Sequence, residues 1–439
     1  MDHRDRHRVL MAHRPCLLEV AAVKVAAVTN RAILVLLAEM QSHTGMKQIT
    51  LFKSFILCSL LSCQLCNATM SALKLELVQV VFRHGARTPG RIEAEHINAT
   101  DPELYPEGYQ ELTNEGKQQA YKLGTLLRKK YDEFLGTHNP EEYFATTTDF
   151  NRTRMSLQLA LTGLFPTVPG DTWNDEIYQN SLDPNIVYVL IPFDTPKYKD
   201  LYPRILTNSS EFQQNISKYT EFLEMMENNT GYPFKQNVIY HAGWTCQAIQ
   251  YHATAHLPLP SWYTGESIDR NLTELYKLGI DSMSLTTQLK RLNGGTLVRK
   301  FIENIKNNRK AALPKKMYLY CAHDLTLNAF SKAQDLEAFY LPPYGSALIM
   351  EKYTDSKKSE YVRMLSWDGV SENFTLVRIG SCEEFCPFED YLNIVKNNVS
   401  TDEDIAYLKE TPPLQVLFPI ENSSTNSTDP FLRDMDPLV

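Results

Sequence analysis

A six-residue apolar segment, Leu77–Phe82, limits the possible folds of this 439-residue chain more than any other feature. Its sequence, Leu-Val-Gln-Val-Val-Phe, is typical of a parallel strand that is covered on both faces. Strand patterns recur at Glu142–Thr147 and Met317–Cys321, and segments with helical spacing of apolar residues alternate with them: Thr113–Phe134, Asn151–Leu164, Leu297–Ile305 and the chain from Leu325 onward. We therefore predict an α/β fold, with a parallel-sheet core and helices on both faces.

A long interruption separates the two halves of this pattern. Strand signals fade between residues 202 and 292, where helical runs such as Glu211–Met226 and Asp269–Leu289 dominate. We predict that 202–292 is a largely helical cap inserted into an α/β core of residues 69–201 and 293–410.

The end of the chain contributes two further segments. Ala347–Tyr353 and Tyr361–Trp367 are predicted to form a strand pair near the edge of the sheet. Residues 411–439 are rich in Pro, Ser, Thr and Asn and are predicted to be a flexible tail.

A short apolar stretch near the N-terminus predicts a signal peptide over residues 46–68. The stretch covers Phe55–Cys66, follows Lys53 and is followed by the small residue Ala68. It is too short to span a bilayer, which needs roughly 20 apolar residues, and it lacks the polar face of a core helix. Residues 1–45 are expected to be an extension without a fold of its own, and the mature protein to be secreted or in the lysosomal lumen, with no membrane span.

Four cysteines would remain after cleavage of this segment. Cys382 and Cys386 are four residues apart, which predicts a short-loop disulfide, whereas Cys246 and Cys321 could pair or stay free thiols. Numerous Asn-X-Ser/Thr sites in polar surroundings predict a glycosylated surface: Asn98, Asn208, Asn215, Asn228, Asn271, Asn373, Asn398, Asn422 and Asn426.

The charge balance argues against a nucleic-acid partner. The chain has 44 Lys and Arg against 52 Asp and Glu, a net charge of −8, and no basic block of useful length. A phosphate backbone needs a clustered basic surface.

The segment Arg83–Pro89 (Arg-His-Gly-Ala-Arg-Thr-Pro) follows the first strand directly. In an open α/β sheet, ligands bind beyond the carboxyl ends of the strands. Arg83 and Arg87 offer planar forks of donors suited to phosphate oxygens. Their charges also disfavour the imidazolium form of His84 and keep one ring nitrogen nucleophilic. The segment predicts capture of a phosphoryl group on His84.

Two further motifs occupy equivalent places. Thr147–Thr153 (Thr-Thr-Asp-Phe-Asn-Arg-Thr) enters a helix, so Arg152 could join the phosphate site, with Arg154 as the competing candidate. Cys321–Asp324 (Cys-Ala-His-Asp) again ends a strand. A histidine there can donate to phosphate, and an adjacent carboxylic acid can protonate a departing alkoxide.

Together these motifs resemble the histidine acid phosphatases of the branch that contains the prostatic, lysosomal and insect venom enzymes. The resemblance covers roughly Leu75–Leu392 and includes Leu259–Trp262 (Leu-Pro-Ser-Trp) and the Cys382, Cys386 pair. It implies a phosphohistidine intermediate on His84 and Asp324 as proton donor. It also implies a phosphate site made of Arg83, Arg87, Arg152 and His323.

The resemblance further implies small phosphomonoester substrates and suggests a homodimer, and no cofactor or metal is predicted. A phosphoglycerate mutase is a weaker match, because those enzymes lack a secretory signal. A phytase is a closer rival, but a phytate site should be strongly basic, and residues 202–292 contain about as many acids as bases. A catalytically silent binding protein is disfavoured because every candidate catalytic position is filled.

Overall fold

The computed structural model describes residues 73–166 and 196–406. The predicted N-terminal extension, signal peptide and C-terminal tail (1–45, 46–68 and 411–439) lie outside the described residues, as do Asn422 and Asn426. No helix within the described ranges is long and apolar enough to cross a membrane.

A seven-stranded sheet forms the centre of the fold, in the order β2-β3-β1-β4-β5-β6, with β7 also paired to β5. Its strands are β1 (Lys74–Arg83), β2 (Tyr143–Thr147), β3 (Met317–Ala322), β4 (Ala347–Thr354), β5 (Glu360–Trp367), β6 (Thr375–Val377) and β7 (Cys386–Pro387). Strands β1, β2 and β3 are parallel, as predicted. The α/β class is confirmed.

The other strand pairs are antiparallel, so the sheet is mixed rather than parallel throughout. For β4 and β5, the antiparallel pairing follows from the short connection between them. Only a short turn joins them, in which Asp355 accepts hydrogen bonds from the backbone N–H groups of Lys357 and Ser359, whereas a parallel pair needs a long crossover. Both predicted strands of this pair exist, but β4 lies in the interior beside β1, and β6 forms the margin.

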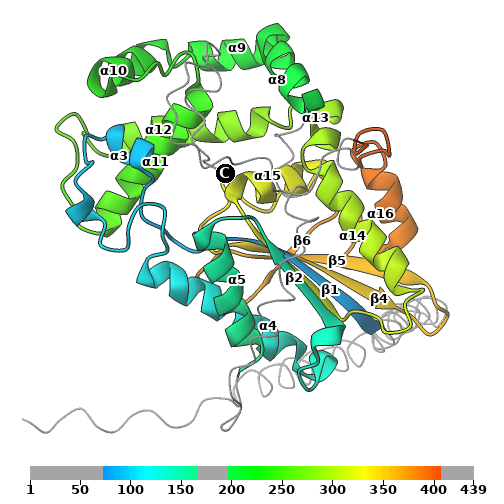
Figure 1. The fold of residues 1–439 in the computed structure, drawn as a ribbon. Coiled ribbons are helices and arrows are strands. Elements are labelled where there is room, and N and C mark those ends of the chain that lie inside the picture. Colours follow the sequence, from blue (N-terminus) through cyan, green and yellow to red (C-terminus); the bar gives the residue numbers. More distant parts are fainter. Residues whose placement is uncertain (1–72, 167–195, 407–439) are drawn as a thin grey trace, which may run out of the picture. The chain divides into compact units, whose positions relative to one another are not determined.

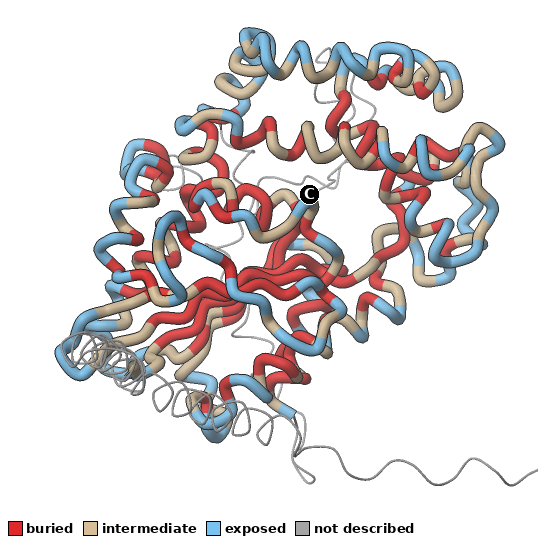
Figure 2. Tube along the Cα trace, turned by 180° about the vertical axis from the view of Figure 1, so that it is seen from behind, coloured by how far each residue is buried: buried red, intermediate tan, exposed pale blue. Residues whose placement is uncertain are grey.

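Helices cover both faces of the sheet, as predicted (Figure 1). Helices α4 (Asn114–Leu135) and α5 (Asn151–Leu164) pack on one face, and α14 (Gly295–Asn308), α15 (Asp324–Ala333) and α16 (Phe388–Val395) on the other. Alternate residues of β1 serve the two cores: Leu77 and Val81 face one, and Val78, Val80 and Phe82 the other. Figure 2 shows the central strands buried over most of their length.

The one polar residue within this run of β1 is satisfied by hydrogen bonds. The Gln79 side chain is fully buried, donates to the carbonyl oxygen of Phe301 and accepts from Asn304 on α14. Burial of Gln79 therefore leaves neither its amide nitrogen nor its amide oxygen without a partner, which allows the strand to lie in the centre of the sheet.

Residues 196–292 are helical where the prediction placed a cap. They form α8 (Pro196–Asn208), α9 (Ser210–Ser217), α10 (Thr220–Thr230), α11 (Val238–Thr254), α12 (Glu266–Ser282) and α13 (Thr287–Leu292). Each of the two predicted helical runs is broken once, between α9 and α10 and between α12 and α13. Figure 1 shows α3 (Arg91–Glu95), from the early chain, beside α11. Short 3-10 helices lie at Pro102–Leu104 and Pro140–Glu142.

The structure shows which of the four cysteines form a disulfide. Cys382 and Cys386 form a disulfide, as predicted, whereas Cys246 and Cys321 are buried free thiols. One predicted glycosylation site is wrong: Asn398 is buried, and its amide donates to the carbonyl oxygen of Ala333, so its side chain is not available to a glycan.

Two glycines bring the start of α4 against the loop that follows β1. A Cβ atom on Gly85 would lie 2.1 Å from the carbonyl oxygen of Gly116, and one on Gly116 would lie 1.9 Å from the carbonyl oxygen of Ala86. Thr113, the first residue of the predicted helical segment, is the N-cap of α4: it accepts a hydrogen bond from the Gly116 N–H and fixes the helix start.

We predict that Gly116→Ala lowers the free energy of unfolding by about 1–3 kcal/mol, because backbone rather than a side chain must move to make room. Urea denaturation measures this change. Gln118→Ala, an exposed position on the same helix, is the control and should change stability by less than about 0.5 kcal/mol. Wild-type stability in Gly116→Ala would show that the two backbones are not held at this distance.

Candidate active site

The carboxyl ends of the three parallel strands bring the three predicted motifs together. Arg83 at the end of β1 pairs in register with Ala322 of β3, and Thr147 at the end of β2 pairs with Cys321. Because β3 lies between β1 and β2, the residues that follow these strands meet at one edge of the sheet. All six predicted site residues lie there and are buried: Arg83, His84, Arg87, Arg152, His323 and Asp324.

The His84 ring has a defined tautomer. Its Nδ1 lies 2.8 Å from the carbonyl oxygen of Gly85, and since a carbonyl only accepts, Nδ1 carries the hydrogen and Nε2 the lone pair. Burial, reinforced by the nearby cations, of which Arg152 and Arg83 contribute most, holds the pKa of His84 well below its usual value. The imidazole therefore stays neutral in mildly acidic solution, with Nε2 available as a nucleophile.

Arg83 is held by acceptors from several elements. Its Nη1 donates to the carbonyl oxygen of Pro342, and its Nη2 lies 2.9 Å from Oδ2 of Asp324 and 3.3 Å from Oε1 of Gln247. The guanidinium also stacks over the Tyr344 ring, 3.8 Å from its centroid. Its Nε has no partner among the described residues.

Arg87 is bound at both ends of its fork by a buried carboxylate. Its Nη1 and Nη2 donate to the two oxygens of Glu93, at 2.7 and 2.6 Å. Nη1 also donates to the carbonyl oxygen of Thr88, and Nη2 to Oε1 of Gln247. A guanidinium has five N–H groups, so these four contacts leave only Nε–H, which has no partner among the described residues.

Arg152 forms no ion pair with any described residue. It lies on the first turn of α5 and is 4% exposed. Its Nη1 donates to Oε1 of Gln110, and its guanidinium lies 4.4 Å from the centroid of the Phe150 ring. Arg154, the competing candidate, is exposed and forms an ion pair with Asp149. The structure thus places Arg152 in the cluster and Arg154 outside it.

The charge of Arg152 is the most costly in the cluster. Burial, with the neighbouring Arg87 guanidinium, lowers the pKa of Arg152 to about 9. Its Nε, like those of Arg83 and Arg87, is a buried donor without a partner in the described part of the chain. Three unpartnered guanidinium N–H groups around a neutral imidazole are an arrangement suited to a tetrahedral anion.

His323 and Asp324 complete the cluster. His323 Nε2 lies 2.9 Å from Oγ1 of Thr148, its ring centroid is 5.6 Å from that of His84, and burial with the nearby arginines keeps its pKa well below the usual value. Asp324 begins α15. Its Oδ2 accepts from Tyr276 as well as Arg83, and its Oδ1 accepts from the backbone N–H of Leu325.

Several residues of the cluster were not found from the sequence. Glu93, Gln110 and Gln247 supply the acceptors that orient the arginines, and Tyr276 and Tyr344 contact Asp324 and Arg83. Gln247 lies on α11 and Tyr276 on α12. Isolated Gln and Tyr residues carry no local signal, because only the packing of the helical segment on the core gives them these partners.

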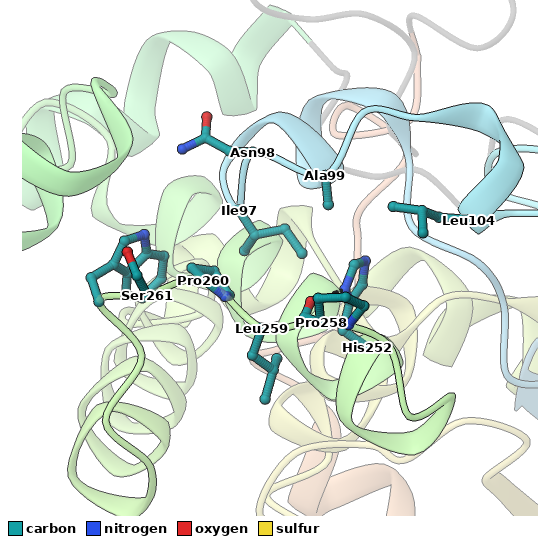
Figure 3. Close-up of a pocket in the computed structure, with 10 residues that line it drawn as sticks. Ile97, Asn98, Ala99, Leu104, His252, Pro258, Leu259, Pro260 and Ser261 are labelled. Carbon is teal, nitrogen blue, oxygen red and sulfur yellow. Dashed lines mark hydrogen bonds between the residues drawn. The ribbon is translucent and has the colours of Figure 1, made fainter.

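A separate cavity of about 300 Å³ lies beside α11, and Figure 3 shows the side chains that line it. It lies between residues 97–104 and 258–262, and its lining includes none of the six site residues. Both ring nitrogens of His252, at its wall, are hydrogen-bonded, to Pro258 and Tyr105. In residues 73–166 and 196–406 no three His, Cys, Asp or Glu side chains are grouped to hold a metal ion.

Comparisons with known proteins agree with this geometry. Residues 74–366 match the model of the histidine phosphatase superfamily (branch 2). The chain is 29% identical to the prostatic acid phosphatase of Mus musculus (78% of this chain, 91% of the relative) and 30% identical to venom acid phosphatase Acph-1 of Apis mellifera (76% and 87%). The phytase structure from Citrobacter braakii shares the fold, with a TM-score of 0.56 at 17% identity (75% and 99%).

The family model covers residues 74–366, which include every residue of the cluster, and the two relatives cover 78% and 76% of the chain. This protein is therefore a member of branch 2 of the histidine phosphatase superfamily, a family of phosphomonoester hydrolases.

Proposed function

We propose that this protein is an acid phosphatase that hydrolyses phosphomonoesters through a phosphohistidine on His84, with Asp324 as the proton donor. One observation carries the proposal. The neutral His84, with its lone pair on Nε2, is surrounded by three buried guanidinium groups, each with an unpartnered Nε–H. No step requires a cofactor.

Phosphate binding comes first in this mechanism. The Nε–H groups of Arg83, Arg87 and Arg152 would donate to the non-bridging phosphoryl oxygens, and His323 would line the same site. The positive end of α5, where Arg152 lies, adds to the favourable potential. Because the terminal nitrogens are already held by protein acceptors, the arginines need little reorganisation when the substrate enters.

The transfer step then forms one bond and breaks another. The Nε2 lone pair of His84 attacks phosphorus, the P–N bond forms, and the P–O bond to the ester oxygen breaks. Asp324, which takes up a proton when the ester binds in acidic solution, gives that proton to the ester oxygen, so that the product leaves as an alcohol or phenol.

Hydrolysis of the phosphohistidine returns the enzyme to its first state. Water attacks phosphorus and loses a proton to the Asp324 carboxylate, the P–N bond breaks, and its electron pair returns to Nε2. Inorganic phosphate leaves with that proton, and Asp324 is again the ionised partner of Arg83. The lowered pKa of His84 keeps the nucleophile neutral in acid, which supports activity below pH 6.5.

The surroundings of the cluster favour a simple phosphomonoester over phytate. Gln110, Gln247, Tyr276 and Tyr344, which contact the site residues, are uncharged. A substrate with many phosphates would need further cations beyond the arginines. A silent binding protein is a poorer explanation, since the tautomer of His84 leaves its nucleophilic nitrogen unengaged.

The remaining expectations belong to the same proposal. A secreted or lysosomal protein with a cleaved segment at 46–68, glycans on exposed sites such as Asn98, and a homodimer fit such an acid phosphatase. So does the division into a core and a cap at 202–292. A turnover panel of p-nitrophenyl phosphate, phosphotyrosine, a nucleotide and phytate from acidic to mildly alkaline pH tests the activity, and no turnover of any of them would refute it.

The Arg152→Met variant tests the anion site without turnover. Removing a buried, unpaired charge should leave the phosphate-free protein as stable as wild type or more stable. Inorganic phosphate should raise the melting temperature of wild type by several degrees and of Arg152→Met by much less. Differential scanning fluorimetry measures both, with Arg154→Met as the exposed control. An unchanged phosphate response in Arg152→Met would remove Arg152 from the site.

The His84→Ala variant tests the nucleophile. It should still bind inorganic phosphate through the arginines but form no phosphoenzyme, with turnover lower by at least several orders of magnitude. Reaction with ³²P-labelled substrate at acidic pH, followed by a rapid quench in alkali, in which a phosphohistidine survives, detects the intermediate in wild type. Trapping of a labelled phosphoenzyme from His84→Ala would assign the nucleophile to another residue.

The Asp324→Asn variant tests the proton donor. The loss of turnover should be much larger for alkyl phosphates than for p-nitrophenyl phosphate, because nitrophenolate departs with little help from an acid. The ratio of kcat values on the two substrates is the measurement. An equal loss on both would mean that the proton comes from elsewhere.

A further inference from the structure

The cluster at the ends of β1, β2 and β3 contains two carboxylates beside its three arginines. Arg83 forms an ion pair with Asp324, and Arg87 forms a bidentate pair with Glu93. Of the three arginines, only Arg152 forms no ion pair with a carboxylate in the described part of the chain. His84 and His323 add no charge, because burial holds the pKa of each well below its usual range. The free site therefore has a net charge of about one positive unit.

Glu93 has no chemical role in the proposed mechanism, yet both oxygens of its carboxylate are held by hydrogen bonds. It lies on α3, is 1% exposed, and its Oε2 also accepts the backbone N–H of Gly90 at 2.7 Å. Burial alone would raise the pKa of Glu93, but the Arg87 guanidinium and the Gly90 N–H outweigh it and keep the pKa below its usual value. The carboxylate thus stays charged through the acidic range.

Among the described residues, the only charged groups that interact with Glu93 are arginines of the motifs. The titratable groups that interact with it are Arg87 and Arg152 from the motifs, His96 at the end of α3, and Tyr105. His96 is hydrogen-bonded to His241 of α11, and the pKa of each is lowered to about 4, so both are neutral above that pH. Glu93 therefore cancels one of the three positive charges that face the phosphoryl group.

We propose that Glu93 is a specificity-determining residue that matches the site to the singly charged form of a phosphomonoester. A site with one net positive charge is neutralised by a monoanion, whereas a dianion leaves an uncompensated negative charge in a buried place. Phosphate esters lose their second proton near pH 6, so the monoanion is the acidic form. The inference rests on the proposed function and adds a reason for activity in acid that is independent of the nucleophile.

The proton count of the mechanism is consistent with this preference. A singly charged ester brings a proton on a phosphoryl oxygen. That proton can pass to Asp324, which forms an ion pair with Arg83 in the free site, and from there to the departing ester oxygen. The substrate then supplies the proton for its own leaving group, and no proton is needed from solvent before transfer.

Two anions of fixed charge test the proposal without reliance on turnover. Sulfate is a dianion and methyl sulfate a monoanion across the pH range of interest, and both are tetrahedral. Their dissociation constants are measured by calorimetry at pH 5 and 7 on the wild-type protein and on Glu93→Gln. Wild type should bind methyl sulfate at least as tightly as sulfate. Glu93→Gln should shift the ratio toward sulfate by about tenfold or more, because one cation is released.

Matched variants separate charge from structure. Glu95→Gln changes the same residue type on the same helix, where Glu95 faces Arg91 and Tyr232, and should leave the ratio unchanged. Glu93→Asp keeps the charge, so its ratio should stay near that of wild type even if both anions bind more weakly. If Glu93→Gln does not fold, the wild-type ratio and Glu93→Asp still decide the question.

Each of three results would overturn the inference. The first is a wild type that binds sulfate tenfold more tightly than methyl sulfate. The others are a ratio of the two dissociation constants that Glu93→Gln leaves unchanged, or one that Glu93→Asp shifts as far as Glu93→Gln does. Turnover of p-nitrophenyl phosphate by wild type is measured in parallel. Turnover without the expected ratios would refute only the role of Glu93, whereas the expected ratios without turnover would refute the proposed function.

Discussion

The burial of three guanidinium groups in one small volume is the constraint on which the rest of the site depends. Like charges at this distance repel, and burial removes the water that would screen them. Each guanidinium has a different acceptor: Arg83 a carboxylate from α15, Arg87 a carboxylate from α3, and Arg152 only an amide oxygen. The buried charge of Arg152 is therefore the least compensated of the three, and an entering anion would compensate it.

Backbone packing makes this concentration of charge possible. The strand order places the ends of β1, β2 and β3 side by side, and the Gly85 and Gly116 backbones come close enough to exclude any Cβ atom between them. The apolar cores on both faces of β1 hold the loop from beneath. The favourable free energy of these cores offsets the cost of burying the charges.

Much of this architecture could be predicted from the sequence because its signals are local. The apolar run of β1, the Thr113 cap and the residues directly after each strand are all readable from neighbours in the chain. The antiparallel pairing of β4, the burial of Asn398 and the partners of the arginines could not be predicted, because each depends on contacts between segments far apart in sequence. Glu93 is the intermediate case: it is only six residues from Arg87, yet nothing in the sequence indicates that α3 turns its carboxylate back onto that guanidinium.

The helical segment takes part in the site rather than merely covering it. Gln247 of α11 accepts hydrogen bonds from Arg83, Arg87 and Tyr344 through a single oxygen, and Tyr276 of α12 donates to Asp324. All three donors to Gln247 are side chains of the core, so the orientation of its amide is fixed by their chemistry. Because α3 packs beside α11 and carries Glu93, the same helix pair supplies both side chains that accept hydrogen bonds from Arg87. Changes in the helical segment far from His84 can therefore alter phosphate binding through these two contacts.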